Sequence, residues 1–254
     1  MKHSPPASDA QYCEDTVRAQ DSDRYLIAFF QQRRLRQASV ALAAWNLELA
    51  RARPRSGETA IGLMRLQWHR EALQEIREGR ARRHPVIGEL AAAHAARLVD
   101  LDHLEGIVDA RERDLDPAPA ANLDDLEAYA RATAGALNAA LWQGTPAAAA
   151  AADAGTAFAL IGLMRSEPIN QAAGRPWAPK SLRGGLRPIV ERAADLARVK
   201  AVPGHRGAVA PAILAAGYVE RARAVGSDPQ HPIMVSVDPG RMWRLAKARL
   251  LGRL

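Results

Sequence analysis

Apolar side chains recur every three or four residues along most of this 254-residue chain, and that spacing restricts the fold more than any other feature. The alternating pattern of a half-buried strand is nearly absent. The only strand-like stretch runs from Ile233 to Val237, and we expect it to be an extended connector. The sequence therefore predicts an all-α protein built as a helical bundle. The first clear buried stripe consists of Leu35, Ala38, Leu42, Trp45 and Leu49.

Helix boundaries follow from residues that start or stop helices. Ser56 and Asn122 are expected N-caps, and Gly79 is expected to end the second of the long helices. In that helix Ile61, Met64, Leu66, Trp68 and Leu73 are available to the core. A leader over residues 1–12 is expected to be flexible, and residues 13–254 are expected to form one domain. The predicted helices cover 14–30, 33–53, 57–78, 84–96, 104–115, 122–141, 145–164, 186–199, 209–224 and 239–251.

Charge and cysteine content limit the environment. The net charge is +7, almost all of it from arginine, which favours acidic partners such as anionic lipid or phosphate. Cys13 is the single cysteine, so no intrachain disulfide is possible and a reducing compartment is expected. The N-terminal residues lack the apolar segment of a secretory signal, and no run appears long enough to span a bilayer. We expect a cytoplasmic protein.

Searches for common catalytic and binding motifs are negative. The sequence contains no phosphate-binding GxxxxGK[ST] loop, no GxSxG nucleophile elbow and no HExxH zinc motif. The seven histidines are scattered, so His69 and the others are expected to be structural and not metal ligands. Aromatic residues make up only 5% of the chain and no reader motif is present, so nucleic acid is not an expected partner.

Six phrases in a fixed order resemble the squalene and phytoene synthase superfamily. The last third of the chain resembles a divergent branch that contains mitochondrial complex I assembly factors and their bacterial relatives. This resemblance implies the all-α isoprenoid-synthase fold. The phrases are DSDRYL (21–26), RRLRQASVALAAWNLELAR (33–51), MRLQWHREAL (64–73), HPV (84–86), LEAYARATAGAL (126–137) and ALIGLMR (159–165).

Catalytic members of that superfamily carry paired aspartates on two helices, and the resemblance places these helices at residues 42–54 and 155–174. The aspartates hold Mg²⁺, which neutralises a diphosphate as it leaves an allylic carbon. Neither stretch of this chain contains an aspartate. The first offers Glu48 beside Arg51, and the second offers Glu167 beside Arg165 and Asn170. Single glutamates next to arginines are a poor cage for several divalent ions.

Two interpretations of these residues stay open. Glu48 with Arg51, and Arg165 with Glu167, form structural ion pairs in the first; in the second they retain a remodelled ligand site. Arg165 matches the arginine that precedes the second aspartate motif in catalytic relatives, and could keep part of a phosphate site. Trp45 and Trp68 are expected to fill the core. The candidate cavity or ligand residues are Glu48, Arg51, Trp68, Arg165, Glu167 and Asn170.

The resemblance and the missing aspartates lead to two functional hypotheses. The first is a non-catalytic binding or assembly factor with no cofactor and no metal, whose protein partner is a subunit of respiratory complex I. A prenyl or lipid ligand is a further candidate for such a protein. The alternative is a Mg²⁺-dependent prenyltransferase that condenses two prenyl diphosphates, with Glu48 and Glu167 as metal ligands.

The C-terminal helix is expected to be amphipathic. Trp243, Ala246, Leu250 and Leu254 fall on one side of it, and most of its cations fall elsewhere. This helix could pack onto the bundle, or it could dock onto an anionic membrane surface. The second option would place a cytoplasmic protein at the inner face of a membrane as a peripheral protein.

Overall fold

The computed structural model describes residues 8–53, 59–182 and 184–252, and all the regular elements in those ranges are helices. The predicted all-α class is therefore confirmed. By their internal contacts the residues divide into two compact units, residues 1–111 (unit 1) and 112–254 (unit 2). This division does not decide whether the units make one domain, so the predicted domain 13–254 stays a prediction.

Unit 1 is organised around its third helix. Its helices are α1 (Asp9–Gln20), α2 (Ser22–Phe30), α3 (Arg33–Ala50), α4 (Thr59–Arg77), α5 (Pro85–Ala95) and α6 (Leu101–Ala110). α3 contacts α1, α2 and α5, while α4 packs mainly on α6. The small side chains of Ala41 and Ala44 on α3 are fully buried and allow this close packing, and the fully buried Trp45 fills the core.

Two boundaries in unit 1 differ from the sequence prediction, and one agrees with it. α1 begins at Asp9, inside the predicted leader, because the Ser8 hydroxyl accepts a hydrogen bond from the Gln11 backbone N–H at 3.2 Å. The predicted helix 14–30 is interrupted at Asp21, whose carboxylate caps α2. Gly79 does follow α4, with a φ of +74°. The expected cap Ser56 and residues 1–7 of the leader lie outside the described residues.

The predicted core positions on α4 are only partly correct. Leu66 and Leu73 are fully buried, whereas Ile61 and Met64 are exposed. The exposed pair lies in the first turns of the helix, before the part that packs on α6. Periodicity identified a stripe but could not show where along the helix its neighbours end.

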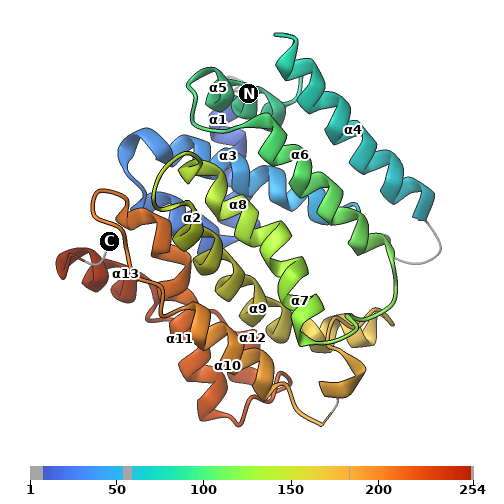
Figure 1. Ribbon diagram of the computed structural model, residues 1–254, viewed down its shortest axis with the longest axis vertical. Coiled ribbons are helices and arrows are strands. Elements are labelled where there is room, and N and C mark those ends of the chain that lie inside the picture. Colours follow the sequence, from blue (N-terminus) through green and yellow to red (C-terminus); the bar gives the residue numbers. More distant parts are fainter. Residues whose placement is uncertain (1–7, 54–58, 183, 253–254) are drawn as a thin grey trace, which may run out of the picture. The chain divides into compact units, whose positions relative to one another are not determined.

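Unit 2 is built around α9 (Ala148–Ala172), the longest helix described. The other elements are α7 (Leu123–Ala130), a π-helical turn η2 (Arg131–Gly135), α8 (Ala136–Ala139), α10 (Arg187–Leu196), α11 (Ala210–Ala224), α12 (Pro232–Val235) and α13 (Arg241–Leu250), with short 3-10 turns at 111–115, 140–142, 180–182 and 206–209. α9 contacts α7, η2, α8, α10, α11 and α12 (Figure 1). Leu160, Ile161 and Met164 carry its side of the core.

The alanine run at the start of α9 packs closely, because its side chains are small. Ala151 and Ala154 are fully buried, and Gly155 lies directly against the π-helical turn. A Cβ atom on Gly155 would lie 2.5 Å from the backbone oxygen of Ala134 and 3.0 Å from the Cα of Gly135. The predicted single helix 122–141 is therefore wrong in detail, since it changes to a π-helical turn where this contact forms.

α9 also revises the expectation that no segment could span a bilayer. It is long and apolar enough to do so by length and composition alone. The core helix of a soluble protein passes the same test, and Leu160 and Ile161 are fully buried within unit 2. We assign α9 to the core of this unit.

The stretch predicted to be an extended connector contains a short helix instead. α12 covers Pro232–Val235, and its first turn is capped by the His231 ring, which accepts a hydrogen bond from the Ile233 backbone N–H at 3.3 Å. The prediction for 233–237 was therefore wrong. The carbonyls at the C-terminal end of α12 are held by two arginines from distant helices, a contact that local sequence does not reveal.

Candidate functional site

Glu48, Arg51 and Trp68 belong to unit 1, and each has its own partners there. The Glu48 carboxylate lies 3.6 Å from Nε2 of His84, which stands just before α5. Arg51 donates to the side-chain oxygen of Gln20 at 3.0 Å. The polar neighbour of Glu48 in the structure is thus His84, and the sequence had indicated His84 only as the start of a helix.

Burial controls the protonation of Glu48. Desolvation raises the pKa of its carboxyl group above the usual range, and the nearby charges of His84 and Arg51 offset only part of this effect. A carboxyl group in that position favours its neutral form more than an exposed one does.

Trp68 lies in an aromatic and basic cluster next to Glu48. Its ring is 5.3 Å from the His84 ring and 4.9 Å from the His69 ring, both edge to face. The Arg82 guanidinium lies 5.1 Å from the centre of the indole and also bonds to Glu75. Trp68 is half-buried, whereas Trp45 is fully buried and fills the core as expected.

His69 is a buried histidine held in its neutral form. The indole N–H of Trp45 donates to His69 Nδ1 at 3.2 Å, so this nitrogen carries no proton. Burial, with smaller effects from the charges of His84 and Arg82, lowers the pKa of His69 to about 4. The expectation that His69 is structural agrees with this geometry.

In unit 2 the carboxylate of Glu167 is fully engaged by backbone and side-chain donors. One oxygen accepts hydrogen bonds from the N–H groups of Trp177 and Ala178, at 2.9 and 3.1 Å. The other accepts from the Gln171 side chain at 3.1 Å. Glu167 is 1% exposed. It fastens the segment after α9 to the helix, which accounts for a buried carboxylate without a metal ion.

The fastened segment is itself ordered by aromatic stacking. The Trp177 ring stacks on the Tyr129 ring at 5.0 Å, with the two planes 26° apart. Tyr129 donates to the Asp114 side chain, and Arg175 donates to the Asp114 backbone oxygen at 2.8 Å. Asn170 turns back onto its own helix, donating to the backbone oxygen of Ser166 at 2.8 Å. The carboxylates of Asp114 and Glu167 thus both accept hydrogen bonds from protein groups.

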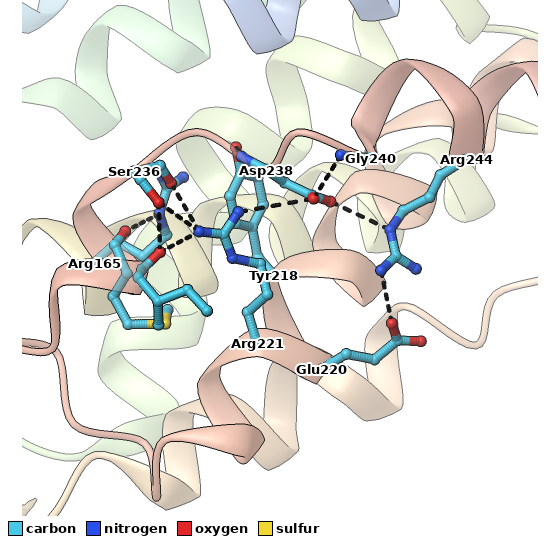
Figure 2. Close-up of polar contacts among 10 residues, drawn as sticks. Arg165, Tyr218, Glu220, Arg221, Ser236, Asp238, Gly240 and Arg244 are labelled. Carbon is cyan, nitrogen blue, oxygen red and sulfur yellow. Dashed lines mark hydrogen bonds and ion pairs between the residues drawn. The ribbon is translucent and has the colours of Figure 1, made fainter.

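Arg165 is used to hold the C-terminal part of unit 2. Its Nε donates to the Met234 backbone oxygen at 2.9 Å, and its guanidinium lies 3.9 Å from the centre of the Tyr218 ring (Figure 2). The partner predicted for it, Glu167, is occupied by the contacts described above. Arg165 therefore acts as a tether for α12.

A second set of contacts surrounds Asp238, which is buried and follows α12 (Figure 2). Arg244 on α13 donates to its carboxylate at 3.2 Å, and Arg221 on α11 lies 3.7 Å from it. Arg221 also donates to the Ser236 hydroxyl at 2.6 Å. The sequence did not reveal this cluster, because Arg221 comes from a different helix than the other members and none of them belongs to a known motif.

A glycine makes room for this cluster on α11. A Cβ atom at Gly217 would lie 2.8 Å from Arg244 Nε and 2.9 Å from an Asp238 oxygen. The Asp238 charge is balanced by two guanidinium groups, so the cluster is a structural anchor for α13. Within residues 8–53, 59–182 and 184–252, no group of three or more His, Cys, Asp or Glu side chains is placed to hold a metal ion.

The fold has clear structural neighbours. A dehydrosqualene synthase solved in complex with a ligand matches with a TM-score of 0.78 and 16% identity, covering 96% of each chain. The squalene synthase HpnC from Alicyclobacillus acidocaldarius matches with a TM-score of 0.69 and 15% identity, covering 87% of this chain and 95% of that one. These likenesses define the class: the protein has the all-α isoprenoid-synthase fold. The squalene/phytoene synthase family model matches residues 17–186, and the chain belongs to this family.

The relatives that match this chain in sequence are named as assembly factors, whereas its structural neighbours are named as synthases. The bovine and human proteins named NADH dehydrogenase (ubiquinone) complex I, assembly factor 6 are 32% and 33% identical over 127 and 126 residues. These matches cover 50% of this chain but only 38% of each relative. The Drosophila melanogaster homolog of that factor is 32% identical over 184 residues, 67% of this chain and 53% of its own length.

Proposed function

We propose that this protein is a non-catalytic member of the squalene/phytoene synthase family that assists the assembly of respiratory complex I by binding a subunit or an assembly intermediate. The similarity to proteins named as complex I assembly factors supports the role. The observation that carries the non-catalytic part is Glu167. Its two carboxylate oxygens accept three hydrogen bonds from its own unit, so the second helix offers no free carboxylate to a magnesium ion.

Glu48 supports the same proposal from unit 1. Burial raises the pKa of its carboxyl group, and the polar group beside it is the His84 ring, 3.6 Å away. We therefore propose that the protein needs no metal ion and no cofactor for its role. A prenyl or lipid molecule remains a candidate ligand, because loss of metal-binding side chains does not by itself fill the space between helices.

The alternative is a prenyltransferase in which Glu48 and Glu167 bind Mg²⁺. The fold shared with dehydrosqualene and squalene synthases is what favours it. That reaction would require Glu167 to give up its hydrogen bonds to Trp177 and Ala178, leaving two part-buried N–H groups without partners. Each such group costs about 1–3 kcal/mol, which argues against this use of the residue.

The assembly role is tested by deleting the gene in the organism of origin. We expect the amount of assembled complex I, measured on native gels and as NADH:quinone activity, to fall severalfold while succinate oxidation is unchanged. Expression of the wild-type chain restores it. The variant Glu48→Gln should restore it equally well, because it keeps the size and shape of the side chain and removes a charge that burial disfavours.

The same complementation separates the two candidates. If Glu48 were a magnesium ligand, Glu48→Gln would fail to complement although the protein folds. Normal complex I in the deletion strain would overturn the assembly role altogether. We further propose that the protein works in the cytoplasm at the inner face of a membrane, where complex I subunits are inserted.

A further inference from the structure

The C-terminal helix α13 buries one apolar side and exposes another. Its buried residues are Leu245 and Ala248, which are 0% and 7% exposed, and the helix packs on α11. Trp243 and Leu250 are 66% and 81% exposed. A helix that only completes a core carries polar side chains on its outer face, so these exposed apolar side chains indicate a further contact.

The exposed apolar side chains of α13 and the turn after it form one stripe. Trp243, Lys247, Leu250 and Leu251 are spaced by four, three and one residues, which places them on a single helical face. Met242 extends this face, and we call Met242, Trp243, Lys247, Leu250 and Leu251 together the α13 face. Val235 and Val237, from the segment before the helix, are also exposed. Leu254, which was expected on the same side, lies outside the described residues.

The C-terminal segment that forms α13 carries only positive charges, and the acidic side chains Asp238 and Glu220 beside it are both paired with Arg244. Residues 239–254 contain four arginines and one lysine and no acidic residue. Arg244 is used internally, since it pairs with Asp238 and Glu220. Lys247 is exposed and sits within the apolar stripe, one turn from Trp243.

A groove beside α13 adds further cations. Lys247 and Leu251 line a hollow of about 720 Å³ between α11, α13 and the 197–201 loop. Arg198 and Lys200 line the same hollow, with Ile213 on its apolar side. The cationic surface thus extends beyond the helix, next to its apolar stripe.

From these observations we infer that the α13 face docks on an anionic lipid bilayer, with Trp243 and Leu250 entering the interfacial region and Lys247 contacting lipid headgroups. Tryptophan is enriched at that depth because its ring is amphipathic. An exposed apolar stripe rimmed by basic residues binds anionic membranes through both buried apolar area and charge attraction. A second copy of this chain fits the face poorly, because a two-fold contact would bring like charges together.

The inference does not depend on the role in complex I assembly, and vesicle binding can be measured with the purified protein alone. The full chain is sedimented with vesicles of phosphatidylcholine, with or without about one third phosphatidylglycerol, at about 0.05 M and 0.5 M salt. We expect binding only to the anionic vesicles, and a large loss of binding at high salt. Absence of binding to anionic vesicles at low salt would overturn the inference.

Single substitutions identify the surface. Trp243→Ala should reduce the vesicle partition coefficient at least fivefold, and Lys247→Gln about fivefold, the expected effect of one interfacial cation. Met64→Gln is the matched control, because Met64 is 71% exposed on α4 in unit 1 and should change nothing. Leu250→Ser, at the last residue of α13, tests the same face with little demand on folding.

Two further outcomes would contradict the inference. Vesicle binding that is unaffected by Trp243→Ala and Leu250→Ser would place the contact elsewhere. Light scattering after gel filtration that shows a dimer, converted to monomer by Trp243→Ala, would assign the face to a second copy of the chain. Far-ultraviolet circular dichroism confirms that each variant is folded before its binding is measured.

Discussion

The carboxylate of Glu167 accepts a hydrogen bond from the backbone N–H of Trp177, 2.9 Å away, and this contact occupies the residue that a remodelled magnesium site would need. The same oxygen also accepts from Ala178. The carboxylate is buried and makes a charge-assisted contact with each donor, which is stronger than a contact between neutral groups. Glu167 is thus a structural residue of unit 2.

This role predicts a loss of stability on substitution. Glu167→Gln keeps the shape and one acceptor oxygen. It loses the negative charge that strengthens the contacts with the Trp177 and Ala178 N–H groups, and its NH₂ group replaces the oxygen that accepts from Gln171. We expect the free energy of unfolding to fall by about 1–3 kcal/mol. Glu191→Gln is the control in the same unit, because its ion pair with Arg223 is exposed to solvent and contributes little to stability. Equal effects of both substitutions in urea titrations would contradict the structural role.

The close contact between α9 and the π-helical turn predicts opposite effects for two glycines on one helix. Gly155→Ala forces a Cβ atom to within 2.5 Å of the Ala134 oxygen and should cost about 1–3 kcal/mol. Gly162→Ala meets no atom within 4 Å and should stabilise the helix by about 0.5–1 kcal/mol. Thermal unfolding of the two variants measures the difference, and a neutral Gly155→Ala would refute the packing described for this turn.

Buried His69 predicts a defined pH dependence of stability. Its pKa is lowered from 6.5 to about 4, so the unfolded chain takes up a proton that the folded protein refuses between these values. The contribution of His69 to the free energy of unfolding is therefore complete above pH 6.5. It is lost as the pH falls toward 4, and the loss amounts to about 3 kcal/mol. Glu48 acts in the opposite direction, because its raised pKa lets the folded protein gain stability as it takes up a proton.

The variant His69→Gln separates the two effects. This variant should be less stable than the wild type at neutral pH. Between pH 6.5 and about pH 4, the slope of its free energy of unfolding against pH should be smaller than that of the wild type, by the equivalent of close to one bound proton. Chemical denaturation at several pH values gives this slope. An unchanged slope would show that His69 titrates normally in the folded protein.

The single thiol is expected to be inert in the folded protein. Burial, with smaller contributions from nearby Glu89, Glu48 and Asp9, raises the pKa of Cys13 to about 12. The reactive thiolate is then about a thousandfold scarcer than for an ordinary cysteine. A disulfide reagent should modify the native chain slowly and the denatured chain fully. Because Cys13 is the only cysteine, rapid reaction of the native protein would contradict its burial without ambiguity.

Local sequence patterns predicted the features of the fold that depend on neighbouring residues in the chain. The helical class, most helix positions and the close packing of the alanine run all follow from periodicity, caps and side-chain size. The exposure of Met64 and the helical form of α12 could not be predicted this way. Both depend on where distant segments lie, such as Arg165 and Arg221 holding the carbonyls after Pro232.

The candidate site shows the same division. The sequence located Glu48 and Glu167 but could not identify their partners. His84 lies 36 positions along the chain from Glu48 by number, and the Trp177 N–H belongs to the backbone, which carries no side-chain signal. Charged neighbours in the sequence, Arg51 and Arg165, were therefore the expected partners, although each one bonds elsewhere.

The most direct test of a family member without magnesium chemistry is diphosphate release by the purified protein. The chain is incubated with farnesyl or geranylgeranyl diphosphate and Mg²⁺, and free diphosphate is measured over time. We predict a rate equal to that of the blank without protein. Release that requires Mg²⁺ and is abolished by Glu48→Gln together with Glu167→Gln would contradict the non-catalytic function and establish the two glutamates as metal ligands.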